Sequence, residues 1–321
     1  KPIVTVSLVS FNQAPYIHKA IESCLMQEVD FGFEVIIHDD ASTDNSAEII
    51  MEYAHKYPEI IFPILQTENQ FSKGIEINAK FNIPKARGKY IAFLEADDYW
   101  IDPLKLKHQI DFMESHPNVS MCFTATKKIT ASNPQNFNVR RFRHHDSFVK
   151  PEDVILIGGH LLDMGSAIAR KSVFEDVPDW YYCSQMWDNT VPLLSMLHGE
   201  IYYINKVTSV YRVNTPGSYI HTHSRSYEKR KLHILKTLEL LEAFNRGTNL
   251  KYDRIIKRKS RLISVGILLL LNSTEDIFKK YYSKLTPGLK LEYKIFNFLN
   301  LYGLWRKYRQ VLSHFRKIKY V

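Results

Sequence analysis

Short apolar runs alternate with amphipathic segments along the first 130 residues of the chain. The runs that predict strands have the sequences VTVSLV, FEVIIH, IIFPIL, YIAFL and VSMCFTA. Apolar residues recur at helical spacing between them, in YIHKAIESCL, SAEIIMEYAHKY, INAKFNIPKA and LKLKHQIDFMESH. This alternation predicts an α/β fold with a Rossmann-like, mostly parallel sheet flanked by helices.

Polar segments follow four of the predicted strands, with the sequences SFNQ, HDDASTD, ENQFSKG and EADD. Ligands of parallel α/β sheets gather at the carboxyl ends of the strands, so we expect five carboxylates around one crevice: Asp39, Asp40, Glu95, Asp97 and Asp98. Clustered carboxylates repel one another unless a cation binds among them. Their oxygens suit Mg²⁺ or Mn²⁺, which in turn suits a nucleoside diphosphate as the ligand.

Charge divides the chain near Ser226. Residues 226–321 contain 22 Lys and Arg against 7 Asp and Glu, a net charge of +15, whereas residues 1–225 have a net charge of −6. The basic part shows helical patterns such as KLHILKTLELLEAF, so we expect a basic helical C-terminal region over residues 226–321. Its composition fits a basic face over neighbouring helices, a helix on an anionic membrane surface or a site for an anionic acceptor glycan, and we expect no nucleic-acid partner.

Three cysteines, Cys24, Cys122 and Cys183, lie far apart, which argues against a disulfide framework and a zinc knuckle. No signal-peptide pattern is recognisable at the start. The longest apolar run, LISVGILLL with Leu271, has about ten residues where a membrane-spanning helix needs about 20. These features favour a cytoplasmic location, with a peripheral position on the inner face of the cell membrane as the further expectation.

Four segments, in this order, resemble the inverting glycosyltransferases of family 2, which have the nucleotide-sugar-binding GT-A fold: VSLVSFNQAPYIHKAIESCLMQ, FEVIIHDDASTDNSAEII, ARGKYIAFLEADDYWIDPLKL and WDNTVPLLSMLHGEIYYINKVTSVYRVNTPGS. The resemblance covers roughly Val4 to Tyr227. It implies a GT-A domain over residues 1–225, with a nucleotide-binding half at 1–126 and an acceptor half at 127–225. It also implies transfer from a nucleotide-sugar, with UDP favoured, to a hydroxyl of a glycan or lipid-linked acceptor in bacterial surface polysaccharide or glycolipid synthesis.

The resemblance assigns roles to individual residues. Contacts for the nucleoside base, ribose and pyrophosphate fall on Phe11, Asn12, Asp40 and Lys80, the last where an arginine is usual. The DxD metal motif falls on Glu95, Ala96 and Asp97, with Glu in the first place, so that Glu95 faces the ribose or a metal-bound water and Asp97 or Asp98 binds Mn²⁺ or Mg²⁺. His221 and His223 lie near where relatives have a loop over the pyrophosphate, and can join the metal or the phosphates.

Transfer also needs a base that removes the proton of the acceptor hydroxyl. The resemblance gives this role to Asp188 in QMWDNTVPLL, where Trp187 and Asn189 depart from the usual neighbours. Asp163 and Asp179 are the competing candidates.

Each of these assignments has a structural alternative. Asp40, Asp44 and Asp188 could cap helices, the EADD segment could be a solvated turn, and the two histidines could be surface residues without a role. We expect Arg212 to pair with an acidic residue rather than to touch substrate. A non-catalytic nucleotide- or glycan-binding member of the fold is the alternative function. A nucleotidyltransferase is less favoured, because SFNQAPY is not a glycine-rich, lysine-bearing loop.

Overall fold

The computed structural model describes residues 1–130, 133–184, 186–215 and 227–271, together with residues 285, 287 and 289–291. The chain divides into two compact units, Lys1–Ser226 and Tyr227–Val321. His221 and His223 lie outside the described residues, as does most of the chain after residue 271.

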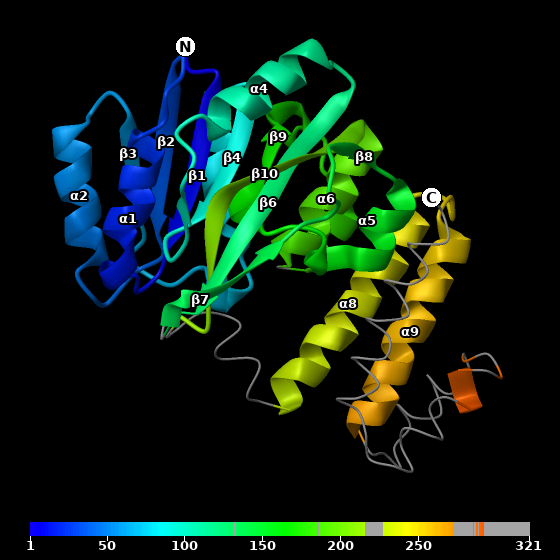
Figure 1. The fold of residues 1–321 in the computed structure, drawn as a ribbon. Coiled ribbons are helices and arrows are strands. Elements are labelled where there is room, and N and C mark those ends of the chain that lie inside the picture. Colours follow the sequence, from blue (N-terminus) through cyan, green and yellow to red (C-terminus); the bar gives the residue numbers. More distant parts are fainter. Residues whose placement is uncertain are drawn as a thin grey trace. The chain divides into compact units, whose positions relative to one another are not determined.

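The first half of unit one has the predicted alternation of strands and helices (Figure 1). Its parallel strands pair in the order β3-β2-β1-β4, and their bounds are Ile61–Leu65, Phe33–Asp39, Val4–Ser10 and Tyr90–Glu95. The intervening helices are α1 (Ala14–Leu25), α2 (Ser46–Lys56), the 3₁₀ turn Phe71–Lys73, the π-helix Asn78–Asn82 and the short α3 (Ile83–Lys85).

The second half continues the same sheet through a short antiparallel strand. Strand β9 (Ile168–Arg170) lies antiparallel between β4 and β6 (Val119–Thr130), and β6 is parallel to β10 (Glu200–Val213). The remaining strands pair antiparallel with β6 or β10, and they are β5 (Tyr99–Trp100), β7 (Asn133–Arg140) and β8 (Ser147–Val149). The helices of this half are α4 (Lys105–Ser115), α5 (Pro151–Ile157), α6 (Trp187–His198) and the 3₁₀ segments Gly158–His160, Met164–Ser166, Lys171–Phe174 and Asp179–Cys183.

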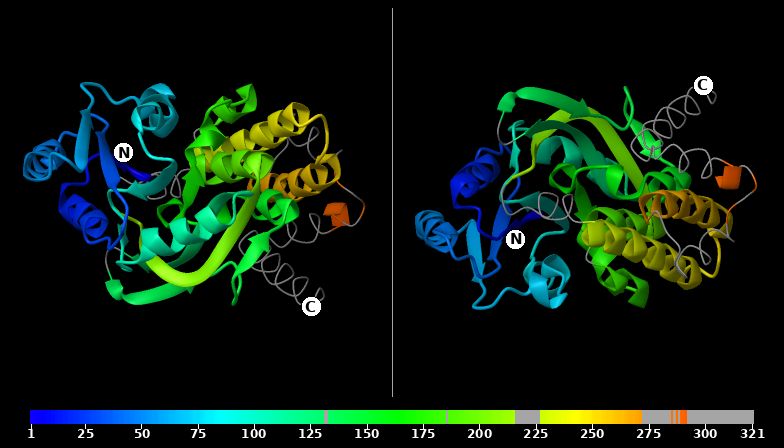
Figure 2. Two further views of the ribbon diagram at one scale, coloured as in Figure 1. Left: turned by 90° about the horizontal axis from the view of Figure 1, so that it is seen from above. Right: turned by 90° about the horizontal axis from the view of Figure 1, so that it is seen from below.

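The two faces of β1 have different contents, because side chains alternate along a strand. Val4, Val6 and Leu8 join an apolar core with buried residues of α1, α2 and α4. Thr5 and Ser7, which are also buried, point to the opposite face. That face is covered by the π-helix, which lies across the strands from α1 (Figure 2).

Unit two is a helical hairpin in its described part. Helix α8 (Tyr227–Gly247) packs against α9 (Asp253–Leu271). The rings of Phe244 and Tyr252 stack with centroids 5.7 Å apart where the two helices join. None of the helices in the described ranges is both long and apolar enough to cross a bilayer.

Candidate active site

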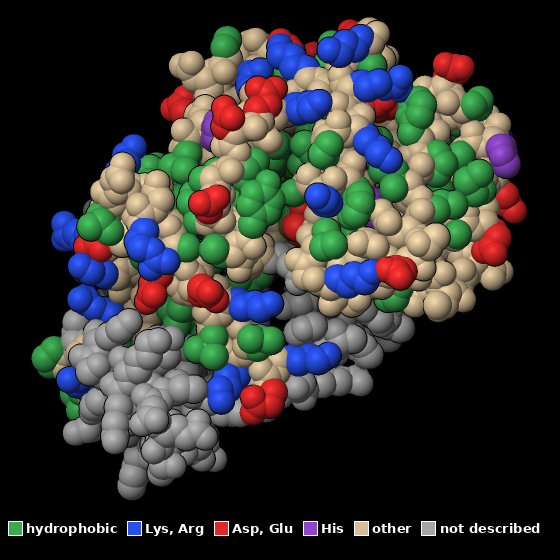
Figure 3. Space-filling model, turned by 180° about the vertical axis from the view of Figure 1, so that it is seen from behind, with side chains coloured by type: hydrophobic (Ala, Val, Ile, Leu, Met, Phe, Trp, Pro, Cys, Tyr) green, Lys and Arg blue, Asp and Glu red, His purple; other side chains and the backbone are tan. Residues whose placement is uncertain are grey.

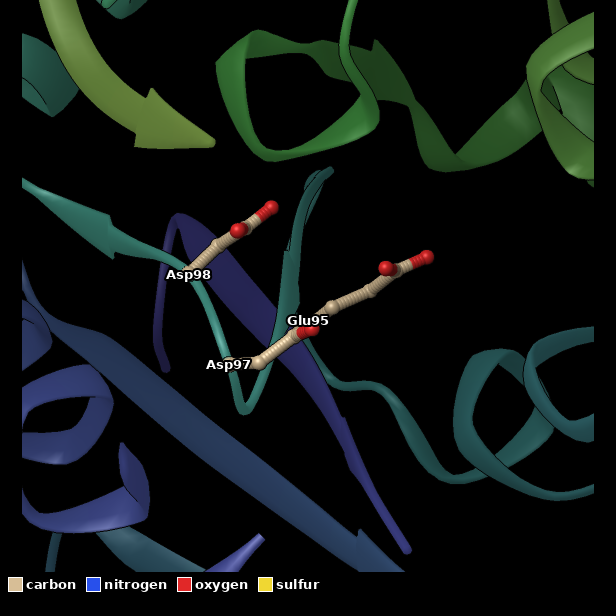
Figure 4. Close-up of side chains that lie close together, drawn as sticks. All are labelled: Glu95, Asp97 and Asp98. Carbon is tan, nitrogen blue, oxygen red and sulfur yellow. The ribbon is translucent and has the colours of Figure 1, made fainter. Parts of the chain in front are cut away.

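Three carboxylates lie together at the carboxyl end of β4. Strand β4 ends at Glu95, and a tight turn follows in which the N–H of Asp98 donates to the carbonyl of Glu95 at 2.9 Å. One oxygen from each of Glu95, Asp97 and Asp98 lies within 4.8 Å of the others (Figure 4). Asp97 and Asp98 are 8% and 3% exposed, whereas Glu95 is exposed to solvent.

The surroundings of this cluster favour protonated carboxylates. Burial, and then the charges of Asp97 and Glu95, raise the pKa of Asp98 well above its ordinary value. The pKa of Glu95 is raised as well, first because the protein atoms around its carboxylate reduce its hydration although part of the side chain is exposed, and then by the charges of Asp97, Asp188 and Asp163. A divalent cation among these oxygens would oppose both shifts. Three carboxylates, two of them buried, therefore form a donor set that fits Mg²⁺ or Mn²⁺.

Arg212 of β10 holds the acidic turn from the second half of the unit. Its backbone N–H donates to the Asp98 carboxylate at 2.8 Å, and its guanidinium donates to the backbone carbonyl of Asp97. The guanidinium also lies 4.9 and 4.7 Å from the ring centroids of Tyr16 and Tyr99. Arg212 thus orients the acidic turn, but its guanidinium binds a backbone carbonyl and two aromatic rings rather than the acidic side chain that the sequence led us to expect.

The loops after β1 and β2 are tied to each other. Asn12, whose φ is 54°, accepts an N–H bond of 2.7 Å from Thr43, and its own N–H donates to the hydroxyl of Ser42 at 2.8 Å. Phe11 beside it is 42% exposed. An exposed aromatic ring on a fixed loop offers a stacking surface for a planar ligand.

Asp40 is engaged with the loop after β3. Its two oxygens accept the N–H groups of Gln70 and Phe71 at 2.7 and 3.0 Å. Asp39 accepts from the N–H and the hydroxyl of Ser42. The sequence predicts both residues around one crevice with the other three carboxylates, but the close cluster contains only Glu95, Asp97 and Asp98 among the described residues. Nearby N–H and hydroxyl donors bind both carboxylates instead, that of Asp39 at the end of β2 and that of Asp40 at the start of the following loop.

Helix capping, which the sequence leaves open for several aspartates, is the role of Asp44. Its carboxylate accepts the N–H of Ser46, the first residue of α2, and the N–H of Ala14, the first residue of α1, both at 3.0 Å. Asp44 therefore joins the starts of two helices.

Two further residues of the predicted donor site have clear positions. Lys80 lies on the π-helix with an exposed side chain. Ala96 is 1% exposed, and its N–H donates to the carbonyl of Val9 at 2.9 Å, which fixes the start of the acidic turn.

Asp188 lies in the first turn of α6, where Met186 occupies the N-cap position. Its Oδ1 accepts a bond of 3.2 Å from the side chain of Asn189, whose own Oδ1 accepts the N–H of Gly159 at 2.7 Å. Burial is the main cause that raises the pKa of Asp188 to about 6. Its charge also raises the pKa of Glu95, so the Asp188 carboxylate lies within electrostatic range of the acidic cluster.

The competing aspartates have different surroundings. Asp163, 5% exposed at its side chain, forms ion pairs of 2.9 Å with Arg140 and 3.3 Å with Lys128. Asp179 is exposed at the start of a 3₁₀ segment. Asp163 is thus neutralised by two cations.

Sequence reasoning missed the role of Lys128 and Arg140. These cations of β6 and β7 lie beside the acidic site, since both bind Asp163 and Arg140 also lowers the pKa of Asp188. The one signal in the sequence is Lys128 itself, a charged residue within the largely buried strand β6. The pairing of β6 with β7, which brings the two cations together, left no comparable signal.

An open basic recess of about 480 Å³ lies elsewhere, at the amino-terminal ends of β1 and β4. Its cationic lining residues are Lys1, Arg87, Lys89, Arg170 and Lys171. Lys and Arg side chains also gather on the upper part of the surface in Figure 3. The recess lies at the amino-terminal ends of the strands and the carboxylates lie at the carboxyl-terminal ends, so the recess is separate from the candidate site.

Comparison with protein families gives one match. The family model described as "Glycosyl transferase family 2" matches residues 5–178. An uncharacterized protein of Mycobacterium tuberculosis is 32% identical over 236 residues, which are 71% of this chain and 63% of that protein. The match therefore spans less than two thirds of that relative's length.

Solved structures that share this fold include two with a bound nucleotide-sugar. S. aureus TarS 1-349, in complex with UDP-GlcNAc, gives a TM-score of 0.56 at 17% identity, covering 96% of this chain and 91% of that chain. Mannosyltransferase PcManGT from Pyrobaculum calidifontis, in complex with GDP-Man and Mn²⁺, gives a TM-score of 0.54 at 16% identity, and the match covers 98% of this chain and 84% of that chain. These likenesses confirm the predicted fold class.

Proposed function

Because its sequence matches the family model over residues 5–178, the chain belongs to glycosyltransferase family 2, and we propose that it is a metal-dependent inverting enzyme. The sugar would pass from a nucleotide-sugar to a hydroxyl of a glycan or lipid-linked acceptor. One observation carries this proposal: the carboxylates of Glu95, Asp97 and Asp98 cluster at the carboxyl edge of the sheet, within electrostatic range of Asp188.

The donor site would be built from the loops at the carboxyl edge. Phe11 and Asn12 offer a ring and a fixed backbone for the base, Asp40 orders the loop after β3, and Lys80 supplies a cation for the pyrophosphate. TarS binds UDP-GlcNAc and the Pyrobaculum enzyme binds GDP-Man, which supports a nucleotide-sugar as the donor. A UDP-sugar is the preferred donor in this proposal.

Asp97 and Asp98 would hold Mn²⁺ or Mg²⁺, and Glu95 would face the ribose. The ion, when bound, neutralises the charge that develops on the departing diphosphate. The Pyrobaculum enzyme was solved with Mn²⁺, which supports this assignment. Arg212 contributes by holding Asp98 and the Asp97 carbonyl in a fixed orientation.

Asp188 would act as the general base. A carboxylate with a pKa of about 6 is ionised at neutral pH and more basic than an ordinary aspartate. Removal of the acceptor proton on the side opposite the departing diphosphate gives a single displacement, and a single displacement inverts the anomeric carbon. An acceptor of bacterial surface polysaccharide or glycolipid synthesis, reached at the inner face of the membrane, completes the proposal.

The first prediction tests the metal site. Thermal unfolding with a panel of UDP- and GDP-sugars should show stabilisation that requires Mn²⁺ or Mg²⁺. Asp97→Ala should weaken nucleotide binding by at least about tenfold in titration calorimetry, because a buried charge-assisted contact is lost. Equal affinity for the nucleotide in chelator and in metal would contradict the metal assignment.

Turnover separates the enzyme from the alternative, a non-catalytic binding protein. An active enzyme releases free nucleoside diphosphate when a suitable acceptor is added to protein, donor and metal. Binding of donor and acceptor without such release would favour the alternative. The residues that make this alternative worth testing are Glu95 and Trp187, which differ from those usual at these positions in the family.

A further inference from the structure

A chain of hydrogen-bonded side chains crosses the face of the sheet opposite to α1. Ser7 of β1 and His38 of β2 point to this face, and Asn78 and Asn82 at the two ends of the π-helix pack over them. Ser7, His38 and Asn82 are 2%, 0% and 1% exposed. A polar network thus occupies positions where apolar side chains would ordinarily pack.

The bonds of this network run in one direction. The side-chain N–H of Asn82 donates to the hydroxyl of Ser7 at 2.8 Å, so Oδ1 of Asn82 must accept from Nδ1 of His38, 3.0 Å away. Ser7 then donates to Oδ1 of Asn78 at 2.5 Å. The backbone and side-chain N–H groups of Asn78 in turn face a carboxylate oxygen of Glu76 at 3.3 and 3.5 Å.

His38 fits the network only in its neutral form with the proton on Nδ1. Burial lowers the pKa of His38, and its effect outweighs the bond to Asn82 and the charge of Asp40, which raise the pKa. Nε2 is buried without a partner among the described residues, so a second proton there would have no acceptor. The ring also packs on Phe81 of the π-helix, with centroids 5.1 Å apart.

The network determines how the π-helix presents Lys80. Asn78 and Asn82 are about one turn apart and face the sheet, which leaves Lys80, midway between them, exposed on the other side. The N–H of Ala79 donates to Glu76 at 2.6 Å, so the start of the segment is tied as well. Short π-helical segments are rare and frequently accompany functional sites.

We propose that Ser7, His38, Asn78 and Asn82 are positioning residues that hold the π-helix, and with it Lys80, in place for the donor nucleotide. This inference rests on the proposed function, in which Lys80 contacts the pyrophosphate. Buried polar networks specify one geometry of a segment more strictly than apolar packing does, and each of these four side chains has at least one partner within the network. Loss of one member should therefore move the segment before it unfolds the domain.

Strand β1 offers a matched pair of variants. Ser7→Ala removes the hydroxyl that bridges Asn78 and Asn82. Thr5→Val removes a hydroxyl on the same face of the same strand, which accepts from Gly88 at 2.9 Å and donates to Glu34 at 2.7 Å. Each variant removes one hydroxyl that donates one hydrogen bond and accepts another, although Glu34 keeps its bonds from Arg87, so Thr5→Val should lose no more thermal stability than Ser7→Ala.

Donor binding should distinguish the two variants. The probes are UDP and GDP, each with Mn²⁺, in titration calorimetry on the full chain. Ser7→Ala should bind at least about tenfold more weakly than wild type, and Thr5→Val within about twofold, because only Ser7 is bonded to the segment that carries Lys80. In hydrogen exchange, the backbone amides of residues 76–85 should be less protected in Ser7→Ala than in wild type, and as protected as wild type in Thr5→Val.

A double-mutant cycle tests the route through Lys80. In a Lys80→Ala background Ser7→Ala should cause little further loss of affinity, because the group that it positions is gone. If Ser7→Ala reduced the affinity for the nucleotide equally in wild type and in Lys80→Ala, Ser7 would not act through Lys80 and this route would be overturned.

The outcomes separate the inference from the proposed function. Wild type that binds neither nucleotide with Mn²⁺ would overturn the proposed function, and the inference with it. Wild type that binds while Ser7→Ala behaves like Thr5→Val would overturn the inference alone.

Discussion

Asp188 shares its proximity to the acidic cluster with Asp163, whose charge also raises the pKa of Glu95 and Asp98, but unlike Asp163 it has no ion-pair partner among the described residues. It lies within electrostatic range of the acidic cluster, and its pKa of about 6 leaves it ionised but basic at neutral pH. Asp163 is held by Lys128 and Arg140, and Asp179 is exposed on a 3₁₀ segment. At the scale of single residues, the environment rather than the residue type distinguishes the proposed base.

The second prediction concerns Asp188→Asn. Asparagine has nearly the same shape as aspartate, so the variant should melt at the wild-type temperature and bind donor and metal with wild-type affinity. Transfer should fall by at least about two orders of magnitude, because general-base assistance contributes roughly 10² to 10⁴ in rate. Asp179→Asn is the control and should keep the wild-type rate. Near wild-type transfer by Asp188→Asn, with loss in Asp163→Asn, would move the role of base to Asp163.

The third prediction concerns Lys105 of α4, which is fully buried. Its Nζ donates to Gln109 at 2.8 Å and lies 4.4 Å from the ring centroid of Trp100, and burial lowers its pKa to about 7. Between about pH 7 and 10 the amine of Lys105 is protonated in the unfolded chain and neutral in the folded chain. Stability should therefore rise with pH in this window by up to about 1.4 kcal/mol per unit.

Lys105→Met should remove this rise in stability with pH. The measurement is the free energy of unfolding in urea of variant and wild type at several pH values, and the difference between the two. Below about pH 7 the difference should be constant, because both states are then protonated. Lys107→Met, two positions along the same helix, is the control and should leave the pH dependence in place. A parallel pH dependence of Lys105→Met and wild type would show that Lys105 stays charged in the folded state.

At the scale of elements, hydrophobic periodicity predicted the strands and helices of the first half. The strands and the helices α1, α2 and α4 bury apolar residues in the core, so their patterns are legible in the sequence. The helix expected at INAKFNIPKA is instead a π-helix followed by the short α3, and it turns Asn78 and Asn82 to the sheet. Strand β9 was not predicted, because three residues are too few to show a period. The GT-A type architecture came from the resemblance to family 2, and the structural likenesses confirm it.

The candidate site was predictable to a similar degree. The acidic turn followed from the position of EADD after a buried strand, and the structure gathers Glu95, Asp97 and Asp98 there. The bonds of Asp40 to the loop after β3 were not predictable, because they depend on where that loop folds back. The same holds for the ion pairs of Asp163, which need the pairing of β6 with β7.

The fourth prediction concerns the 3₁₀ segment Gly158–His160, which abuts the start of α6. A Cβ on Gly159 would lie 2.4 Å from Oδ2 of Asp188 and 2.7 Å from Nδ2 of Asn189. Gly159→Ala should therefore displace the Asp188 carboxylate and lower kcat by about tenfold or more, since misplacement of a reacting group by about 1 Å can cost about 10²-fold. The affinity for donor should stay unchanged.

Gly32→Ala is the matched control, because a Cβ there meets its nearest atom at 3.7 Å. It should leave kcat unaltered. A kcat for Gly159→Ala equal to that of Gly32→Ala would mean that Asp188 is not sensitive to this contact.

At the scale of the whole molecule, the two units differ in charge. Residues 226–321 have a net charge of +15 and residues 1–225 have −6. Three exposed cations, Arg254, Lys257 and Arg258, follow one another at helical spacing on α9. Such a face can bind an anionic membrane surface, which is part of the proposed function.

The fifth prediction is that the full chain sediments with vesicles containing phosphatidylserine and less so with neutral vesicles. Raising the salt concentration should release it, because charges are screened beyond about 10 Å at 0.1 M. Replacing Arg254, Lys257 and Arg258 by Gln should weaken sedimentation by about tenfold or more, at about 1 kcal/mol per cation. Sedimentation that is insensitive to both changes would assign these cations to another role.

The antiparallel strand β9 has a consequence for synthesis on the ribosome. Strand β4 is complete once residue 95 has emerged, yet its edge beside β9 gains a partner only when residues 168–170 follow. At 5–20 residues per second this interval lasts roughly 4 to 15 s. During that time the nascent chain presents residues 90–92 of β4 as an open apolar edge, and such edges recruit other strands. Chaperone capture of the nascent chain should therefore be strongest in this window and end when β9 docks.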